Sequence, residues 1–145
     1  VRPHWDPLKG VDEIVAKHQN IHIYRFPYED GITLPKLLLE SICVVMPIRR
    51  MSIDPQLVIA ETLAAGVPII TTDQRSNPEF VLDGKTGYLV PLNDVDATTD
   101  ALDRMLSDID ATAEMGRRGE RDIATRWNWD NYAEELLQSY DCVTR

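Results

Sequence analysis

The sequence has few of the residues on which disulfide-linked, metal-binding or nucleic-acid-binding proteins depend. It contains 2 cysteines and 3 histidines, and the cysteines are too far apart for a metal site. Its formal net charge of −9 argues against a general surface for nucleic acid or anionic membrane. No apolar run approaches the roughly 20 residues that span a bilayer, and the first residues do not resemble a signal peptide. We therefore expect a cytoplasmic protein that binds no nucleic acid and holds no metal or cofactor.

Helix and strand patterns alternate along the chain, which has 43% hydrophobic and 27% charged residues. We expect strands at 21–26, 42–46, 67–72 and 88–90, and helices at 9–18, 34–41, 55–65, 77–82, 95–107, 111–126 and from 129 onward. The continuous apolar runs at 42–46 and 67–72 are typical of strands buried on both faces of a parallel sheet. The order predicts an α/β fold, a Rossmann-like parallel sheet with helices on both faces, as one domain over residues 1–145.

The last helix carries its apolar side chains at helical spacing. They form one stripe along the helix, made of Trp129, Tyr132, Ala133, Leu136, Leu137 and Tyr140. We expect part of this stripe to be exposed if its partner is another domain.

Cations of this acidic chain follow the predicted strands. Ligands of open parallel sheets bind beyond the carboxyl ends of the strands. Arg49 and Arg50 follow the strand at 42–46, and the helix near Pro55 begins a few residues later. Arginine pairs well with phosphate, and a helix N-terminus offers unpaired N–H groups, so this edge suits a phosphate-bearing ligand. The alternative is that the two arginines are a solvated pair in a loop.

Glu61 stands among apolar and small residues in the helix at 55–65, which looks buried nearly all round. A buried carboxylate needs a partner, and a ribose diol could supply two hydroxyls to it. The alternative is a surface glutamate on the single solvent-exposed stripe of that helix.

Four segments together resemble the group 1 (family 4) retaining glycosyltransferases of the GT-B fold. Residues 61–73 are similar to the family's E-A-M-A-x-G-x-P-V-V-x-T-D segment, and 77–81 to its x-P-E-x-V turn. Residues 83–91 are similar to D-G-x-T-G-x-L-V-P, and 127–140 to the closing F-S-W-E…L…Y helix. A weaker likeness joins Arg2 and residues 9–12 to the family's G-R…K-G-V-D segment.

The resemblance implies a C-terminal domain that holds a nucleoside diphosphate sugar. The sugar or lipid-linked acceptor would sit on an N-terminal domain that we expect to lie outside this chain, and peripheral membrane association of the full protein stays open. Glu61 matches the glutamate that holds the ribose, and Arg2 and Lys9 match the basic pair on the diphosphate. Backbone N–H groups near Gln56, Leu57 and Val58 would face the phosphate or the sugar. The full protein would transfer a hexose with retention, without a metal-binding Asp-x-Asp pair.

The sequence departs from the family pattern just before the helix at 55–65. Ile53 stands where the family has a first glutamate that engages the transferred sugar, and Asp54 is the candidate to replace it. One residue of shift on a helix N-terminus turns a side chain by about 100°. Two readings therefore stay open: the donor half of an active transferase, or a degenerate, non-catalytic nucleotide-sugar-binding or interaction module.

Overall fold

The computed structural model describes residues 11–24, 31–49 and 54–143. Its internal contacts divide the chain into two units, residues 1–33 and 34–145, each described here by itself. The expectation of one domain over 1–145 stays a prediction.

The first unit contains one helix in its described part, α1 (Val11–Lys17). It confirms the helix expected at 9–18 over the residues that are described. The strand expected at 21–26 is wrong for residues 21–24, which form no regular structure, while 25 and 26 lie outside the described residues. The side chains of Ile21, Ile23 and Tyr24 are exposed. An alternating pattern forms a strand only when a neighbouring strand pairs with it, and these residues have no such partner in the described chain.

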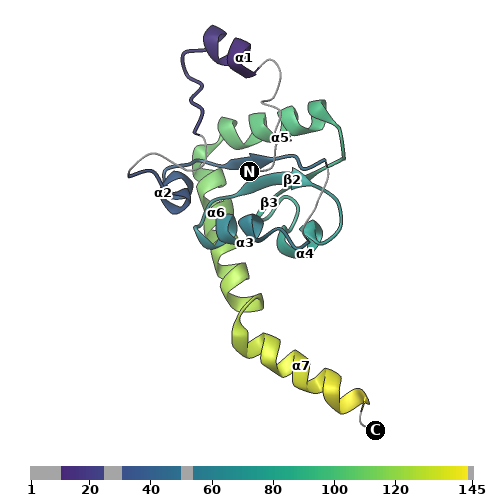
Figure 1. Cartoon of the computed structure of the whole chain (residues 1–145). Helices are drawn as coiled ribbons and strands as arrows, with labels where there is room; N and C mark the ends of the chain where they lie inside the picture. Colours follow the sequence, from purple (N-terminus) through teal and green to yellow (C-terminus); the bar gives the residue numbers. More distant parts are fainter. Residues whose placement is uncertain (1–10, 25–30, 50–53, 144–145) are drawn as a thin grey trace, which may run out of the picture. The chain divides into compact units, whose positions relative to one another are not determined.

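The second unit is built on a parallel sheet (Figure 1). Its strands are β1 (Val44–Met46), β2 (Ile69–Thr72) and β3 (Gly87–Val90), in the order β1-β2-β3. Val44 pairs with Ile69, and Ile69 in turn pairs with Gly87. The connections are helical: α3 (Leu57–Ala64) joins β1 to β2, and α4 (Asn77–Phe80) joins β2 to β3. The expected parallel α/β fold is confirmed.

Helices cover both faces of the sheet. Because side chains alternate along a strand, Ile69 and Ile70 of β2 enter different clusters. Ile69 packs with residues of α3, α4 and the second half of α6 (Ile109–Arg126). Ile70 packs with α5 (Val95–Ser107) and the first half of α6. In Figure 1, α5 lies on one side of the sheet and α3 and α4 on the other, as in a doubly wound fold.

β1 is less buried than its apolar sequence predicts. Val45 is 41% exposed, and Ile42 just before the strand is exposed as well. The expectation that 42–46 is buried on both faces is therefore wrong, whereas all four residues of β2 are buried. The reason is position: β2 lies between two strands, while β1 is an edge strand of the described sheet. The short helix α2 (Leu34–Leu39) precedes it.

The C-terminal helix α7 (Trp129–Val143) presents the expected apolar stripe to solvent. Trp129 is 83% exposed, and the stripe's other large members, Tyr132, Leu136, Leu137 and Tyr140, are exposed too. By contrast, the Trp127 ring stacks on buried Phe80 with ring centroids 4.4 Å apart. The chain therefore packs firmly up to Trp127, while the stripe that follows contributes little burial to this unit.

Candidate functional site

The carboxyl end of β2 holds the loop that follows β1 through buried hydroxyl groups. The Thr71 hydroxyl donates to the carbonyl oxygen of Met46 at 3.0 Å, and the Thr72 hydroxyl donates to that of Ile48 at 2.9 Å. Both threonines are buried, so these bonds satisfy groups that water does not reach. The start of the loop at 47–49, which carries Arg49, is thereby fixed against β2.

Gln74 adds a second connection between the same loops. Its Nε2 atom donates to the Ile48 carbonyl oxygen at 2.5 Å and to the Thr72 hydroxyl oxygen at 2.8 Å. The Ile48 carbonyl thus accepts two hydrogen bonds from the residues that end β2. Arg49, the residue that follows Ile48, is exposed.

Asn77, the first residue of α4, is completely buried beneath the same loops. Its Nδ2 atom donates to the Thr72 carbonyl oxygen at 2.9 Å and to the Thr71 hydroxyl oxygen at 3.3 Å. These two bonds fix the orientation of the amide. Its Oδ1 atom is buried without a hydrogen-bond partner in the described part of the chain. Leaving a buried acceptor unpaired costs about 1–3 kcal/mol of folding free energy.

Asp54 is connected to the loop after β2 by a hydrogen bond. Its Oδ1 atom accepts a hydrogen bond from the Ser76 hydroxyl, although its carboxylate is otherwise exposed. Ser76 and Gln74 belong to one short loop, so that loop contacts the chain on both sides of residues 50–53. The candidate catalytic carboxylate therefore stands just before α3, with one oxygen engaged by a neighbouring hydroxyl.

The N-terminus of α3 opens at this edge. Its N-cap, Gln56, has an extended backbone and no side-chain capping bond, and the first turn carries no acidic residue. The first N–H groups of a helix have no acceptor within it and lie at the positive end of its dipole. Leu57 is 67% exposed and Val58 is half-buried. The segment 56–58 can therefore present backbone donors to an anion, and the binding role expected for it stays a prediction.

Glu61 lies on the exposed face of α3, one turn beyond Leu57 and near Ala64, which is also exposed. The expectation of a helix buried nearly all round is therefore wrong. The buried face is formed by Ile59, Thr62 and Leu63, which pack on the sheet and α6. The solvent-exposed stripe consists of Leu57, Glu61 and Ala64, at positions i, i+4 and i+7. Its exposure makes the Glu61 carboxylate reachable from solvent, and its role stays a prediction.

Three of the expected site residues, Arg2, Lys9 and Arg50, lie outside the described residues, as does Ile53. The others lie on neighbouring elements: Arg49 follows β1, Asp54 and Gln56 precede α3, and Leu57, Val58 and Glu61 belong to α3. No role was predicted for Thr72, Gln74 and Ser76, which donate the hydrogen bonds at this edge. Polar residues that directly follow a buried strand were the available signal for them.

Two Asp-x-Asp sequences occur in the chain, at 94–96 and 108–110, and the expectation that no such pair binds a metal stays a prediction. Both begin helices: Asp94 accepts from the Ala97 N–H at 2.8 Å, and Asp108 accepts from the Ala111 N–H at 2.9 Å. Their carboxylates act as N-caps. Within the ranges that the structure describes, no group of three His, Cys, Asp or Glu residues could hold a metal ion. The described helices include none long and apolar enough to cross a membrane.

Among the residues that the structure describes, two titratable groups have shifted pKa values, and both lie away from this edge. Burial raises the pKa of the Cys43 thiol, which packs beside the cluster around Ile70. Hydrogen bonds from Arg117 and Arg121 lower the pKa of the Glu114 carboxyl on α6, with bond lengths of 2.8 and 3.0 Å.

Residues 6–108 match the family model described as "Glycosyl transferases group 1". The GDP-mannose-dependent alpha-(1-6)-phosphatidylinositol monomannoside mannosyltransferase of Mycobacterium tuberculosis is 38% identical over 80 residues, which are 55% of this chain and 21% of that protein. The D-inositol 3-phosphate glycosyltransferase of Corynebacterium urealyticum is 35% identical over 97 residues, which are 67% of this chain and 22% of that protein. This chain therefore spans about a fifth of the length of these relatives.

A solved structure with the same arrangement is sucrose-phosphate synthase from Thermosynechococcus elongatus. It has a TM-score of 0.59 and 27% sequence identity, covering 70% of this chain and 25% of that one.

Proposed function

The chain belongs to the group 1 glycosyltransferases, and from this premise we propose that it is the part of such an enzyme that binds a nucleoside diphosphate sugar. The observation that carries the proposal is the acid-free N-terminus of α3 at the carboxyl edge of the sheet, with Arg49 before it and Glu61 exposed along it. This arrangement offers donors and positive charge to a diphosphate, and a carboxylate to a ribose.

Each residue has a distinct part in this proposal. The backbone N–H groups at Gln56, Leu57 and Val58 donate to the diphosphate. Arg49 and Arg50 neutralise its charge. Glu61 accepts from the two ribose hydroxyls.

In the transfer step, a hexose passes to an acceptor hydroxyl with retention, and negative charge develops on the leaving diphosphate. Cations and helix N–H groups that are already in place stabilise that charge more in the transition state than in the ground state. Arg49 and Arg50 can supply this positive charge, so the proposal needs no metal or cofactor.

The relatives suggest the classes of donor and acceptor. One is named for GDP-mannose and a phosphatidylinositol mannoside, the other for inositol 3-phosphate. We propose a nucleoside diphosphate hexose as donor and a sugar or lipid-linked acceptor held by a further domain.

Calorimetric titration with UDP, GDP and ADP and their sugars tests the proposal. We expect saturable binding of at least one nucleotide diphosphate, weakened by added salt because exposed charges are screened. If no nucleotide of the panel binds, the donor-site proposal is wrong.

The second candidate function is a donor-binding module without turnover. The Ser76–Asp54 hydrogen bond favours it, because it engages an oxygen of the carboxylate proposed to act on the sugar. Ile53 at the position of the family's first glutamate favours it too. Donor binding without any donor hydrolysis or transfer, measured on a protein that also contains the acceptor domain, would select this candidate.

A further inference from the structure

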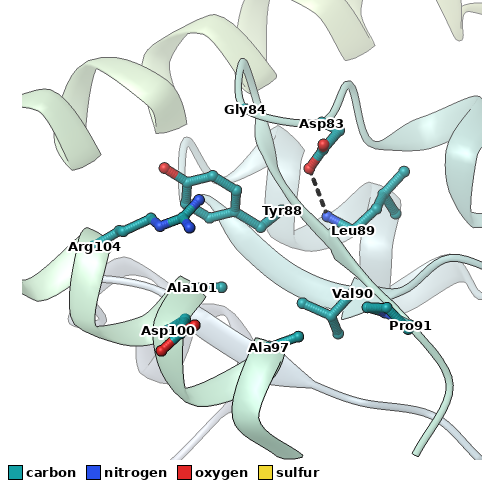
Figure 2. Close-up of a pocket in the computed structure, with 10 residues that line it drawn as sticks. All are labelled: Asp83, Gly84, Tyr88, Leu89, Val90, Pro91, Ala97, Asp100, Ala101 and Arg104. Carbon is teal, nitrogen blue, oxygen red and sulfur yellow. Dashed lines mark hydrogen bonds between the residues drawn. The ribbon is translucent and has the colours of Figure 1, made fainter. Parts of the chain in front are cut away.

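A pocket of about 360 Å³ runs along the outer side of β3, between that strand and α5 (Figure 2). It is lined by the turn before β3, by β3 itself and by one face of α5. Its volume is at the small end of the range for small-molecule sites, about 300–1,000 Å³. It shares no residue with the proposed donor site.

Two of the outward-facing hydrogen-bonding groups of β3 already have partners. The Leu89 N–H donates to the Asp83 carboxylate at 2.9 Å, and the Gly87 carbonyl accepts from the Gly84 N–H at 2.8 Å. Pro91, the next residue on that side, has no N–H to offer. A peptide that adds to a sheet as a strand needs these groups, so the pocket is unsuited to strand addition and suits a small molecule.

The charged side chains of the pocket have mixed sign. Asp83 and Asp100 bring two exposed carboxylates, and Arg104 brings a guanidinium. With two carboxylates against one guanidinium, an anionic ligand is repelled on balance, and a cationic ligand still meets one like charge at Arg104. A neutral ligand with several hydroxyls gains from both, since each hydroxyl can donate to a carboxylate and accept from the guanidinium.

The remaining surface is apolar and includes an aromatic ring. Val90 and Ala101 are buried at the base, and Tyr88 is half-buried beside them. Figure 2 shows the Arg104 side chain extending from α5 toward the Tyr88 ring. The electron-rich face of an aromatic ring attracts weakly positive C–H groups. A sugar ring has such C–H groups on its faces and hydroxyls at its rim.

We propose that this pocket is a secondary saccharide site, which takes a neutral mono- or disaccharide unit apart from the donor. It extends beyond the proposed function, because donor binding at the α3 edge does not require it. The saccharide can be a free sugar or one unit of a longer glycan, and the two sources share the same chemistry.

Amide NMR titration of the chain tests the site with methyl α-mannoside, methyl α-glucoside and a mannobiose as probes. We expect saturable shifts confined to Gly84, Leu89, Ala101 and their neighbours, with glucuronic acid binding roughly fivefold more weakly or worse, which is a difference of about 1 kcal/mol. Tighter binding of mannobiose than of the monosaccharides would assign the site to a glycan, and equal binding to a free sugar. No shifts at these residues with any neutral probe would overturn the proposal.

Variants on the exposed surface of α5 separate the site from general weak binding. Asp100→Asn and Arg104→Ala should each weaken saccharide binding by roughly fivefold. Asp103→Asn, on the same helix but outside the pocket, and Arg118→Ala on α6 should leave it unchanged. Equal losses in Asp100→Asn and Asp103→Asn would contradict the assignment. A parallel titration with GDP and UDP reports on residues of α3, so failure of the saccharide site is distinguishable from failure of the donor site.

Discussion

Gly116 of α6 lies against the backbone of Gly66, so closely that a β-carbon at position 116 would be 2.0 Å from the Gly66 carbonyl oxygen. Gly66 itself ends α3 with a φ of 72°, in the left-handed region that glycine adopts without strain. The two glycines are needed for different reasons. Gly66 permits the turn into β2, and Gly116 permits α6 to approach that turn.

Gly116→Ala should destabilise the second unit by about 2–4 kcal/mol, because the added methyl group meets backbone rather than a flexible side chain. On an exposed helix position the same substitution would stabilise by about 1 kcal/mol through helix propensity. Urea denaturation followed by circular dichroism measures the difference. Ala113→Ser, on the exposed side of α6, is the control and should change stability by less than about 0.5 kcal/mol. A stability of Gly116→Ala equal to wild type would contradict the close approach.

Trp129→Ala should change the stability of this chain by less than about 1 kcal/mol, because the side chain is 83% exposed. A loss of about 3–5 kcal/mol would be expected only if Trp129 were packed in a core. Trp127→Ala is the matched comparison. It should cost about 1–3 kcal/mol, since the Trp127 ring is 44% exposed but stacks on Phe80. Denaturant unfolding of both variants tests this order, and a larger loss for Trp129→Ala would reverse it.

Local patterns predicted most of the second unit, because they are set by neighbours in sequence. The helix expected at 95–107 is confirmed, and the structure shows that Asp94 caps it and that Gly66 follows α3 with a positive φ. The strand at 21–26 and the burial of 42–46 could not be predicted in the same way, because both depend on a strand partner far along the chain.

At the candidate site, the sequence indicated the edge of the sheet but not its internal bonds. Nothing in the spacing of Gln74 and Ile48, or of Ser76 and Asp54, predicts which side chain contacts which carbonyl or carboxylate. Glu61 is exposed because the opposite face of α3 packs on α6. The glycines of α6 let that helix approach α3 at this face, as Gly119 does against Leu63.

Cys43 should react with thiol reagents more slowly than Cys142, which is exposed. Burial raises the Cys43 pKa, so less of the reactive thiolate is present at a given pH. The raised pKa also makes the folding stability depend on pH. The stability that the neutral Cys43 thiol contributes is complete below the ordinary thiol pKa, and it is lost as pH rises through the raised pKa. Labelling of native protein at pH 8, with the sites identified by mass spectrometry, measures the two rates. Faster labelling of Cys43 would contradict its burial.

Glu61→Gln should weaken binding of the best nucleotide diphosphate by roughly tenfold or more and leave the fold intact. Glu61 is exposed, so its replacement removes no packing, whereas hydrogen bonds to a charged group contribute about 1.5–3 kcal/mol. Titration calorimetry gives the affinity, and thermal unfolding checks the fold. Glu134→Gln on α7, also exposed and far from α3 in sequence, is the control for loss of charge. Unchanged affinity in Glu61→Gln would remove the ribose assignment.

This chain alone should bind a donor but transfer no sugar. Transfer needs the acceptor hydroxyl within roughly 3–3.5 Å of the anomeric carbon, and this positioning supplies much of the rate. We expect the acceptor to be held by a part of the enzyme that the chain does not include, since it spans about a fifth of its relatives. Without that part, the donor sugar faces water, so slow hydrolysis is the most that we expect. Donor hydrolysis and transfer assays on the chain, run beside a binding titration, test this. Efficient transfer to any acceptor would show that the residues proposed to bind the donor also complete an active site by themselves.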